Sequence, residues 1–257
     1  MRQKTHPHYR QRSLRNMPRF PSNIRAISLD LDDTLWPVGP TIVRAEQRAQ
    51  AALTESAPQV AAVWDIGRLR TLRAKILDEQ QHLRHDLLQI RRLALQHAFA
   101  DCGLSTAASA APIETALRVF MTARNEVELY PEVEACLQRL GRRYRIASLT
   151  NGNADLKIVG LAHLFHTTVS AHEHGTTKPD PALFHITCKQ LECAPEQVVH
   201  VGDDPDFDVR GATNAGLHAV WINRTNAQWP GEDRPHEVNS LECLERWLEN
   251  DAGSLER

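Results

Sequence analysis

The sequence lacks several features that would assign it to a membrane-spanning, nucleic-acid-binding or disulfide-rich class. It has no apolar run near the ~20 residues that a transmembrane helix needs, so we expect no membrane partner. Its formal net charge is only −2, so nothing in the composition predicts a nucleic-acid partner. Its five cysteines are scattered without a CxxC pair, which favours reduced, packed thiols in a cytoplasmic protein.

Acidic residues are absent from the first twenty positions, MRQKTHPHYRQRSLRNMPRF. This segment is basic, and it has no apolar stretch of the kind found in a secretory signal. We therefore expect residues 1–22 to form a basic, disordered arm. Alternatively, translation begins at Met17, which lies at a natural distance before the first expected strand.

The spacing of apolar residues changes at about residue 40, from that of a strand to that of helices. Residues 24–31, IRAISLDL, are rich in apolar and β-branched side chains and predict a buried strand. From 40 to 126, apolar residues recur at helical spacing, which predicts a helical bundle. Within the bundle, Gly103 fits the end of a helix, Pro112 fits the start of one, and the small residues at 105–112 fit a loop.

From residue 130 onward, expected helices alternate with expected strands. The strands are 144–151, 166–171, 197–203 and 218–223, and the helices are 130–141, 154–162, 180–192, 208–216 and 240–249, the last opened by a capping pair of Asn239 and Glu242. This alternation predicts an α/β fold whose doubly wound parallel sheet carries an inserted helical domain. The expected division is a core of 23–39 and 127–250 and a helical domain of 40–126, and 257 residues suffice for both cores.

Polar residues gather just after the expected strands. The four clusters are Asp30, Asp32, Asp33 and Thr34; Thr150, Asn151, Gly152 and Asn153; Lys178; and Asp203, Asp204, Asp206 and Asp208. Because the carboxyl ends of parallel strands share one edge of a sheet, the first, second and fourth clusters should meet there. Lys178 lies on a loop that can reach the same edge.

This set of side chains indicates chemistry on a phosphate ester. Carboxylates crowded at one point repel each other unless a hard cation neutralises them, and oxygen ligands suit Mg²⁺. A hydroxyl, a turn containing glycine and a lysine are natural holders of phosphate. One carboxylate can attack phosphorus to form an acyl phosphate, and a second can protonate the leaving oxygen. We therefore expect Mg²⁺ as the cofactor and a small-molecule phosphate ester as the substrate.

Four stretches in this order, DLDDTL, LTNGN, TKPDP and VGDDPDFD, resemble the four motifs of the haloacid dehalogenase (HAD) superfamily of phosphohydrolases. The resemblance covers residues 24–225 and implies a Rossmann-like core with residues 40–126 as the C1 cap of that family. It also implies roles for individual residues. Asp30 is the nucleophile and Asp32 the general acid/base; Thr150, the Asn151 amide and Gly152 bind the phosphoryl group; Lys178 orients Asp30; and Mg²⁺ is bound by Asp30, the Asp32 carbonyl and Asp203, with support from Asp208.

Several neighbouring polar residues are expected to do no chemistry. Asp33 is interpreted as the cap of the turn, Asp206 as a solvated acid, and His172 and His174 as loop residues. Whether Asp204 helps to bind the metal stays open.

Three further residues are candidates for binding the leaving group. Trp36 either stacks on a flat ring of the substrate or simply packs. His85 and Arg91 lie with Asp86 in HLRHDLLQIRR (82–92), which is interpreted as an amphipathic helix whose polar residues either face the cleft or form a solvated face.

Among HAD reactions, a phosphatase is expected. Asp32 supplies an acid that halide displacement does not need, which argues against a dehalogenase. A phosphonate hydrolase would need a cap lysine that forms a Schiff base; Lys75 is the only lysine in the cap, and Asp32 again favours an ester as the substrate. A sugar-phosphate mutase, a general metabolite phosphatase and an idle binding protein stay open, as does the choice between monomer and homodimer. Further stretches resemble a proteobacterial subgroup that dephosphorylates flavin mononucleotide and the phosphoribitylaminouracil of riboflavin biosynthesis.

Overall fold

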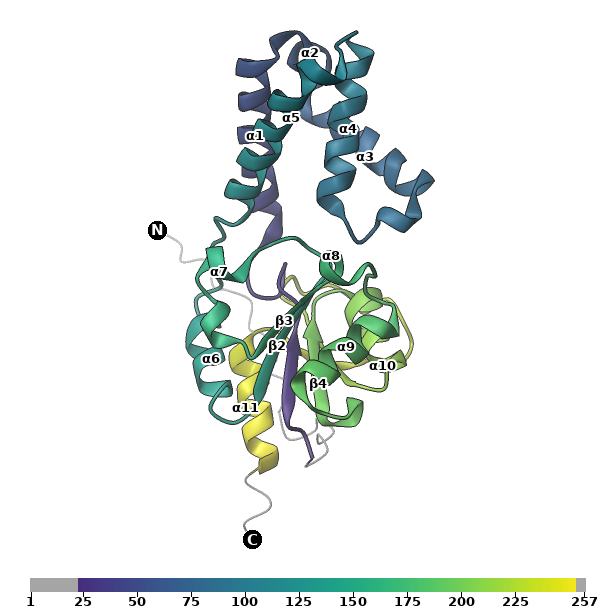
Figure 1. Cartoon of the computed structure of the whole chain (residues 1–257). Helices are drawn as coiled ribbons and strands as arrows, with labels where there is room; N and C mark the ends of the chain where they lie inside the picture. Colours follow the sequence, from purple (N-terminus) through teal and green to yellow (C-terminus); the bar gives the residue numbers. More distant parts are fainter. Residues whose placement is uncertain (1–22, 253–257) are drawn as a thin grey trace, which may run out of the picture.

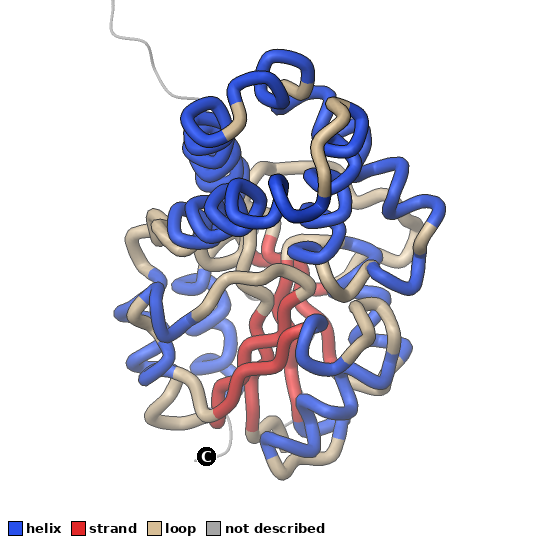
Figure 2. Tube along the Cα trace, turned by 45° about the horizontal axis from the view of Figure 1, so that its top comes forward, coloured by secondary structure: helices blue, strands red, loops and turns tan. Residues whose placement is uncertain are grey.

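The computed structural model describes residues 23–252, and the expected arm at 1–22, with Met17, lies outside the described residues. Within the described range, six strands form one parallel sheet in the order β3-β2-β1-β4-β5-β6 (Figures 1 and 2). The strands are β1 Ala26–Leu29, β2 Arg145–Thr150, β3 Thr167–Ser170, β4 Val198–Gly202, β5 His218–Ile222 and β6 His236–Val238. The predicted doubly wound parallel sheet is therefore confirmed.

Helices cover both faces of the sheet, as Figure 1 shows. The helices of the sheet domain are α6 Val133–Leu140, α7 Leu156–Val159, α8 Ala171–His174, α9 Pro181–Leu191, α10 Gly211–Asn214 and α11 Leu241–Ala252, with 3₁₀ turns at Ala162–Leu164 and Pro195–Gln197 and a π-helical turn at Pro205–Arg210. On one face, α6 and α11 pack on Ile27 and Leu29 of β1. On the other face, α9 and α10 pack on Ala26 and Ala147. Successive side chains of a strand point to opposite faces, so both faces of these central strands are apolar.

The remaining helices form a separate layer above the carboxyl edge of the sheet (Figure 1). They are α1 Val38–Ser56, α2 Pro58–Val63, α3 Ile66–Glu79, α4 Leu87–Asp101 and α5 Thr106–Arg124, with a 3₁₀ turn at Gln81–Leu83. This layer, called the cap below, has its own apolar core, in which Leu53 of α1 packs with Phe99 of α4 and Leu117 of α5. None of the described helices combines the length and apolar character needed to cross a bilayer.

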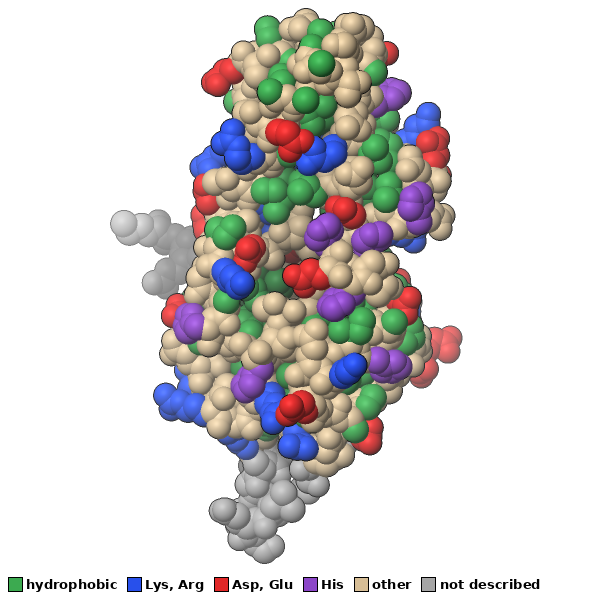
Figure 3. Space-filling model, in the orientation of Figure 1, with side chains coloured by type: hydrophobic (Ala, Val, Ile, Leu, Met, Phe, Trp, Pro, Cys, Tyr) green, Lys and Arg blue, Asp and Glu red, His purple; other side chains and the backbone are tan. Residues whose placement is uncertain are grey.

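The cap joins the sheet domain through two segments, 30–37 after β1 and 125–132 after α5. Figure 3 shows a recess where the cap meets the sheet domain, with acidic and histidine side chains around it. The chain order reverses between β1 and β4, and ligands of such sheets bind at the carboxyl ends of the strands beside this point. The first and fourth polar clusters follow these two strands.

Three local predictions were wrong. Pro112 lies inside α5 and residues 105–112 are not a loop, because Ser105 caps the helix by accepting from the backbone N–H of Ala108, and the alanine-rich turn that follows favours a helix. The cap of α11 is Ser240, whose Oγ accepts from the N–H of Cys243, rather than Asn239. Strand β6 was not predicted, because only three residues of a polar stretch form it.

Candidate active site

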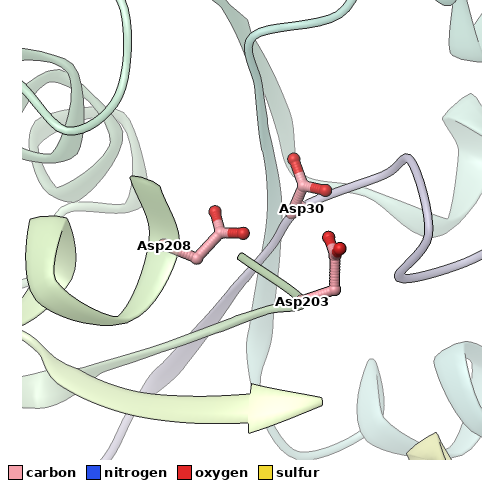
Figure 4. Close-up of side chains that lie close together, drawn as sticks. All are labelled: Asp30, Asp203 and Asp208. Atoms are coloured by element: carbon pink, nitrogen blue, oxygen red, sulfur yellow. The ribbon is translucent and has the colours of Figure 1, made fainter. Parts of the chain in front are cut away.

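Three of the predicted acids converge on one point beneath the cap. Asp30 follows β1, Asp203 follows β4, and Asp208 lies in the π-helical turn that comes next (Figure 4). One carboxylate oxygen from each lies within 4.8 Å of the other two. In an octahedron with Mg–O bonds of about 2.1 Å, opposite ligands are about 4.2 Å apart, so this donor set fits Mg²⁺ after a small adjustment.

Lys178 bridges two acids of this group. It comes from the loop between α8 and α9, and its Nζ donates to Oδ1 of Asp30 at 2.5 Å and to Oδ1 of Asp208 at 2.6 Å. The lysine side chain is 3% exposed. The side chain of Asn151 fixes the loop, because its Oδ1 accepts from the backbone N–H of Lys178 at 2.8 Å and its Nδ2 donates to the backbone carbonyl at 3.0 Å. Asn151 thus positions Lys178, a contact that sequence reasoning did not suggest.

His200 is a second residue that sequence reasoning missed. It is fully buried in β4, and its Nε2 lies 3.0 Å from Oδ1 of Asp208 while its Nδ1 lies 3.0 Å from Oγ of Ser28. Because a carboxylate only accepts, Nε2 donates to Asp208 and Nδ1 accepts from the serine hydroxyl. Burial lowers the pKa of His200, so the ring is neutral. Its signal in the sequence was hidden, because it stands among the valines of a core strand.

The acids of this site have displaced pKa values. Burial raises the pKa of Asp30 well above its usual range, with Lys178 opposing and Asp208 and Asp203 adding to the rise. Burial also raises the pKa of Asp203 to about 7, and the neighbouring Asp208 adds to it. Burial would raise the pKa of Asp208 too, but Lys178 and His200 outweigh it and lower the value. The charged forms of Asp30 and Asp203 are therefore disfavoured, and a bound cation would stabilise them.

Close packing beneath the site depends on Gly202. A Cβ on this residue would lie 2.2 Å from Cγ of Asp208, which no arrangement of the carboxylate could accept without moving the backbone. The glycine at the end of β4 therefore lets Asp208 lie against the strand, where Lys178 and His200 reach it.

Asp32 lies apart from the metal-binding group and has partners of its own. Nε1 of Trp36 donates to its Oδ1 at 2.8 Å, and Nη2 of Arg124 donates to Oδ1 at 2.7 Å and to Oδ2 at 2.6 Å. Trp36 is fully buried, which favours packing over stacking on a substrate ring. Arg124 was not predicted, because an arginine at the end of an amphipathic helix has no signal that distinguishes it from a solvated residue.

The loop expected to bind the phosphoryl group follows β2. Thr150 is 4% exposed, and its Oγ1 accepts from the backbone N–H of Gly152 at 2.9 Å. Gly152 lies directly against Asp32 and Arg124, since a Cβ there would be 2.6 Å from Oδ2 of the acid. The second cluster, the general acid candidate and the end of the cap helix therefore meet in one place.

The other acids have structural partners. Oδ1 of Asp33 accepts from the N–H of Val38 at 2.9 Å and so caps α1. Oδ1 of Asp204 accepts from the N–H groups of Asp206 and Phe207, both at 2.8 Å, which gives this carboxylate a capping role and leaves it outside the metal-binding group. Asp206 is exposed and forms an ion pair with Arg210, as expected of a solvated acid.

The cap candidates lie in different surroundings from those expected. His85 and Asp86 precede α4 in a turn, where Asp86 caps the helix by accepting from the N–H of Gln89 at 2.8 Å. Oδ2 of Asp86 also lies 3.5 Å from Nδ1 of His172, which belongs to the short helix α8 instead of a loop. The cap thus touches the sheet domain on this side as well as at its two connecting segments.

Arg91 points into the interior of the cap. Its guanidinium carbon lies 3.5 Å from the centre of the Phe120 ring, and its Nη1 lies 3.7 Å from Oε1 of Glu46. Arg70 and Arg73 pair with the same buried carboxylate. Burial lowers the pKa of Arg91 to about 9, and the positive charge of Arg73 contributes. Glu46, Arg73 and Arg91 border a small cavity of about 30 Å³ within the cap.

Comparison with known proteins identifies relatives across nearly the whole described fold. A family model described as haloacid dehalogenase-like hydrolase matches residues 24–216. The chain is 29% identical over 226 residues to the 5-amino-6-(5-phospho-D-ribitylamino)uracil phosphatase YigB of Escherichia coli K12, with 86% of this chain and 94% of that protein covered. It is 30% identical over 215 residues to the glyceraldehyde 3-phosphate phosphatase of Methanopyrus kandleri, with 80% and 86% covered.

Among solved structures, the crystal structure of 2-haloacid dehalogenase from Pseudomonas syringae pv. tomato DC3000 is similar at a TM-score of 0.83 and 34% sequence identity. The match covers 88% of this chain and 99% of that one. Relatives of this fold thus include proteins named as phosphatases and a protein named as a dehalogenase.

Proposed function

The chain belongs to the haloacid dehalogenase-like hydrolases, and we propose that it is a magnesium-dependent phosphatase that hydrolyses a small-molecule phosphate monoester through an aspartyl-phosphate intermediate. The observation that carries the proposal is the buried pair of Lys178 and Asp30 beside two further acids, with Asp32 held separately nearby. The pair prepares one carboxylate as a nucleophile, and Asp32 is left as a proton donor.

Each residue has a distinct part in the proposed reaction. An oxygen of Asp30 attacks phosphorus while the bond from phosphorus to the ester oxygen breaks, and Asp32 gives its proton to the leaving alcohol. Lys178, the Thr150 hydroxyl and the amides of the loop after β2 hold the equatorial oxygens. Water then attacks the aspartyl phosphate and gives its proton to Asp32, which releases phosphate and restores the Asp30 carboxylate and the protonated Asp32.

The proposed metal ion would be held by Asp30, Asp203 and the backbone carbonyl of Asp32, with support from Asp208, the third acid of the group. When bound, Mg²⁺ would offset the negative charge that Asp30, Asp203 and the phosphoryl group bring to one place. Lys178 alone offers one positive charge against three carboxylates, which supports the need for a cation here.

The proposed substrate is an alkyl phosphate of the riboflavin pathway, either flavin mononucleotide or phosphoribitylaminouracil. Two things support it: the likeness of the motif-flanking sequence to that subgroup, and the printed activity of the E. coli relative, which is matched over most of its length. Other metabolite phosphates are the alternative, and the same panel of substrates decides between them.

A haloacid dehalogenase is the second candidate, favoured by the name of the similar Pseudomonas structure. The presence of Asp32 with two hydrogen-bonding partners argues against it, because displacement of halide requires no acid at this position. A sugar-phosphate mutase would retain both aspartates and differs in its product, and an idle binding protein would bind a phosphate ester without turning it over.

The test measures phosphate release from a panel that contains flavin mononucleotide, sugar phosphates and nucleotides, with and without Mg²⁺. Wild type, Asp30→Asn and the exposed control Asp206→Asn are compared, and 2-chloropropionate is included with chloride as the readout. Mg²⁺-dependent phosphate release that is lost only in Asp30→Asn supports a phosphatase. Chloride release, sugar-phosphate isomerisation without free phosphate, or binding without turnover would each support the corresponding alternative.

A further inference from the structure

Arg124 connects the cap to the general acid candidate more directly than any predicted residue does. It is the last residue of α5, and its Nη2 donates to both carboxylate oxygens of Asp32, at 2.7 and 2.6 Å. The arginine is 1% exposed, so solvent does not screen this pair as it would an ion pair at the surface.

Both oxygens of Asp32 are engaged in the described arrangement. Oδ1 accepts from Nε1 of Trp36 as well as from Arg124, and Oδ2 accepts from Arg124. The second terminal nitrogen of the arginine, Nη1, is buried without a hydrogen-bond partner among the described residues. An unpaired buried donor is unfavourable by about 1–3 kcal/mol, so a small movement that gives Nη1 an acceptor would be favoured.

The fit around this pair is close. A Cβ on Gly152 would lie 2.6 Å from Oδ2 of Asp32 and 3.2 Å from both Nη2 of Arg124 and Oγ1 of Thr150. The loop that is proposed to hold the phosphoryl group therefore lies against the same pair. Only a glycine at this position leaves room for the three groups together.

The backbone beside Arg124 is tied to both domains. Oδ1 of Asn125 accepts from the N–H of Asp155 in the sheet domain at 2.7 Å, and Oε1 of Glu126 lies 2.6 Å from Nη1 of Arg48 in the cap helix α1. Asp32 belongs to the first segment that joins the cap to the sheet domain (30–37), and Arg124 directly precedes the second (125–132). The pair therefore bridges both connections, and a change in the angle of α5 would move the guanidinium relative to the carboxylate.

We propose that Arg124 is a positioning residue that orients the Asp32 carboxylate toward the leaving-group oxygen and couples this orientation to the position of the cap. This role rests on the proposed phosphatase function. Arg124 acts only through Asp32, so in the first step, the formation of the aspartyl phosphate, it matters to the extent that the leaving group needs a proton. An alkyl alcohol needs one, whereas p-nitrophenolate is a stable anion that leaves without it.

The test compares two esters, flavin mononucleotide and p-nitrophenyl phosphate, with wild type, Arg124→Gln and Arg124→Lys. General acid catalysis contributes about 10²–10⁴-fold to a rate, so Arg124→Gln should lower kcat/KM for the alkyl ester by about 10²-fold. This parameter covers the steps up to release of the alcohol and leaves out hydrolysis of the aspartyl phosphate, in which Asp32 is the base for both esters. The loss of kcat/KM for p-nitrophenyl phosphate should stay below about 3-fold on the same reasoning. Arg124→Lys should recover part of the alkyl activity, because it retains a donor at this position.

Two controls separate positioning from general damage to the fold. Arg118→Gln changes an exposed arginine of the same helix and should leave both activities unchanged. In an Asp32→Asn background, Arg124→Gln should cause no further loss, because residues that act as one unit are not additive. This double variant also removes both charges of the pair and so protects the test if the single variant folds poorly.

Equal losses of kcat/KM for the two esters, or a full further loss in the Asp32→Asn background, would overturn the positioning role while wild-type hydrolysis stands. Failure of wild type to hydrolyse either ester would instead overturn the proposed phosphatase, and the role of Arg124 with it. The two failures are therefore distinguished by the wild-type measurements in the same experiment.

Discussion

Lys178 and Asp30 are 148 positions apart in the chain, yet Nζ of the lysine lies 2.5 Å from Oδ1 of the aspartate. Burial lowers the pKa of Lys178, but Asp208 and Asp30 outweigh it and raise the value, so the ammonium is charged at neutral pH. One buried cation is thus shared by two buried carboxylates.

Replacing this lysine should lower both activity and stability, and a second substitution should restore only the stability. Lys178→Met leaves two buried carboxylates without their partner, and breaking a buried pair destabilises by about 3–5 kcal/mol. We expect loss of activity together with a large fall in melting temperature. A further Asp208→Asn should restore part of the stability and none of the activity, measured by thermal unfolding and phosphate release. Lys189→Met, at an exposed position of α9, is the control and should change neither.

Mg²⁺ should stabilise the protein more at pH 8 than at pH 6. The pKa of Asp203 is about 7 in the folded protein, above its usual value of 3.8, so between these values the folded state binds the extra proton. The metal-free fold therefore loses stability as pH rises toward 7, and the carboxylate released there is the form that a cation binds.

The measurement is the shift in melting temperature when Mg²⁺ is added at a concentration on the order of 5–10 mM, which loads a weak site. Asp203→Asn should reduce the shift and remove its pH dependence, whereas Asp206→Asn should preserve both. A shift of equal size at pH 6 and pH 8 in wild type would contradict the assignment of Asp203 as a ligand.

Gly152→Ala should impair the reaction strongly although it adds one methyl group. The new Cβ would lie 2.6 Å from Oδ2 of Asp32, so the acid, Arg124 or the loop has to move. We expect kcat for alkyl phosphates to fall by about 10-fold or more, since misplacing a catalytic group by about 1 Å is that damaging. Gly39→Ala in α1 meets nothing within 4 Å and is the matched control. Normal turnover in Gly152→Ala would show that the loop tolerates displacement.

The position of the site was predictable because parallel strands place their carboxyl ends together. Asp30 and Asp203 directly follow mostly apolar strands and Thr150 ends another, and this pattern can be recognised from the sequence alone. Lys178 was predictable for a different reason. Its stretch, TKPDP, resembles one of the four HAD motifs, and it occurs in the expected order with the other three.

The residues that sequence reasoning missed reach the site through tertiary packing. His200 stands among valines, and its contact with Asp208 depends on a turn that no local pattern reveals. Arg124 lies 92 positions from Asp32, and only the path of the cap back to the sheet brings them together. Pro112 misled for the opposite reason, because a strong N-terminal cap at Ser105 outweighed the local preference of proline for a helix start.

The interior of the cap supplies a comparison between a buried and an exposed carboxylate. Glu46 is 4% exposed and faces Arg70, Arg73 and Arg91, whereas Glu114 is 59% exposed and pairs with Arg92. Glu46→Gln removes the negative charge that balances the largely buried guanidiniums of Arg73 and Arg91 and the half-exposed one of Arg70, whose mutual repulsion then stands unopposed.

We expect Glu46→Gln to lower the free energy of unfolding by about 3–5 kcal/mol, the usual result of removing one partner of a buried pair. Glu114→Gln should change it by less than about 1 kcal/mol, because exposed pairs contribute little. Urea unfolding followed by circular dichroism measures both variants at one pH and salt concentration. Since Arg91 packs on Phe120 of α5, four residues before Arg124, the loss of Glu46 should also loosen this helix. If the two variants were equally stable, the three arginines would be held by packing alone and Glu46 would not balance their charge.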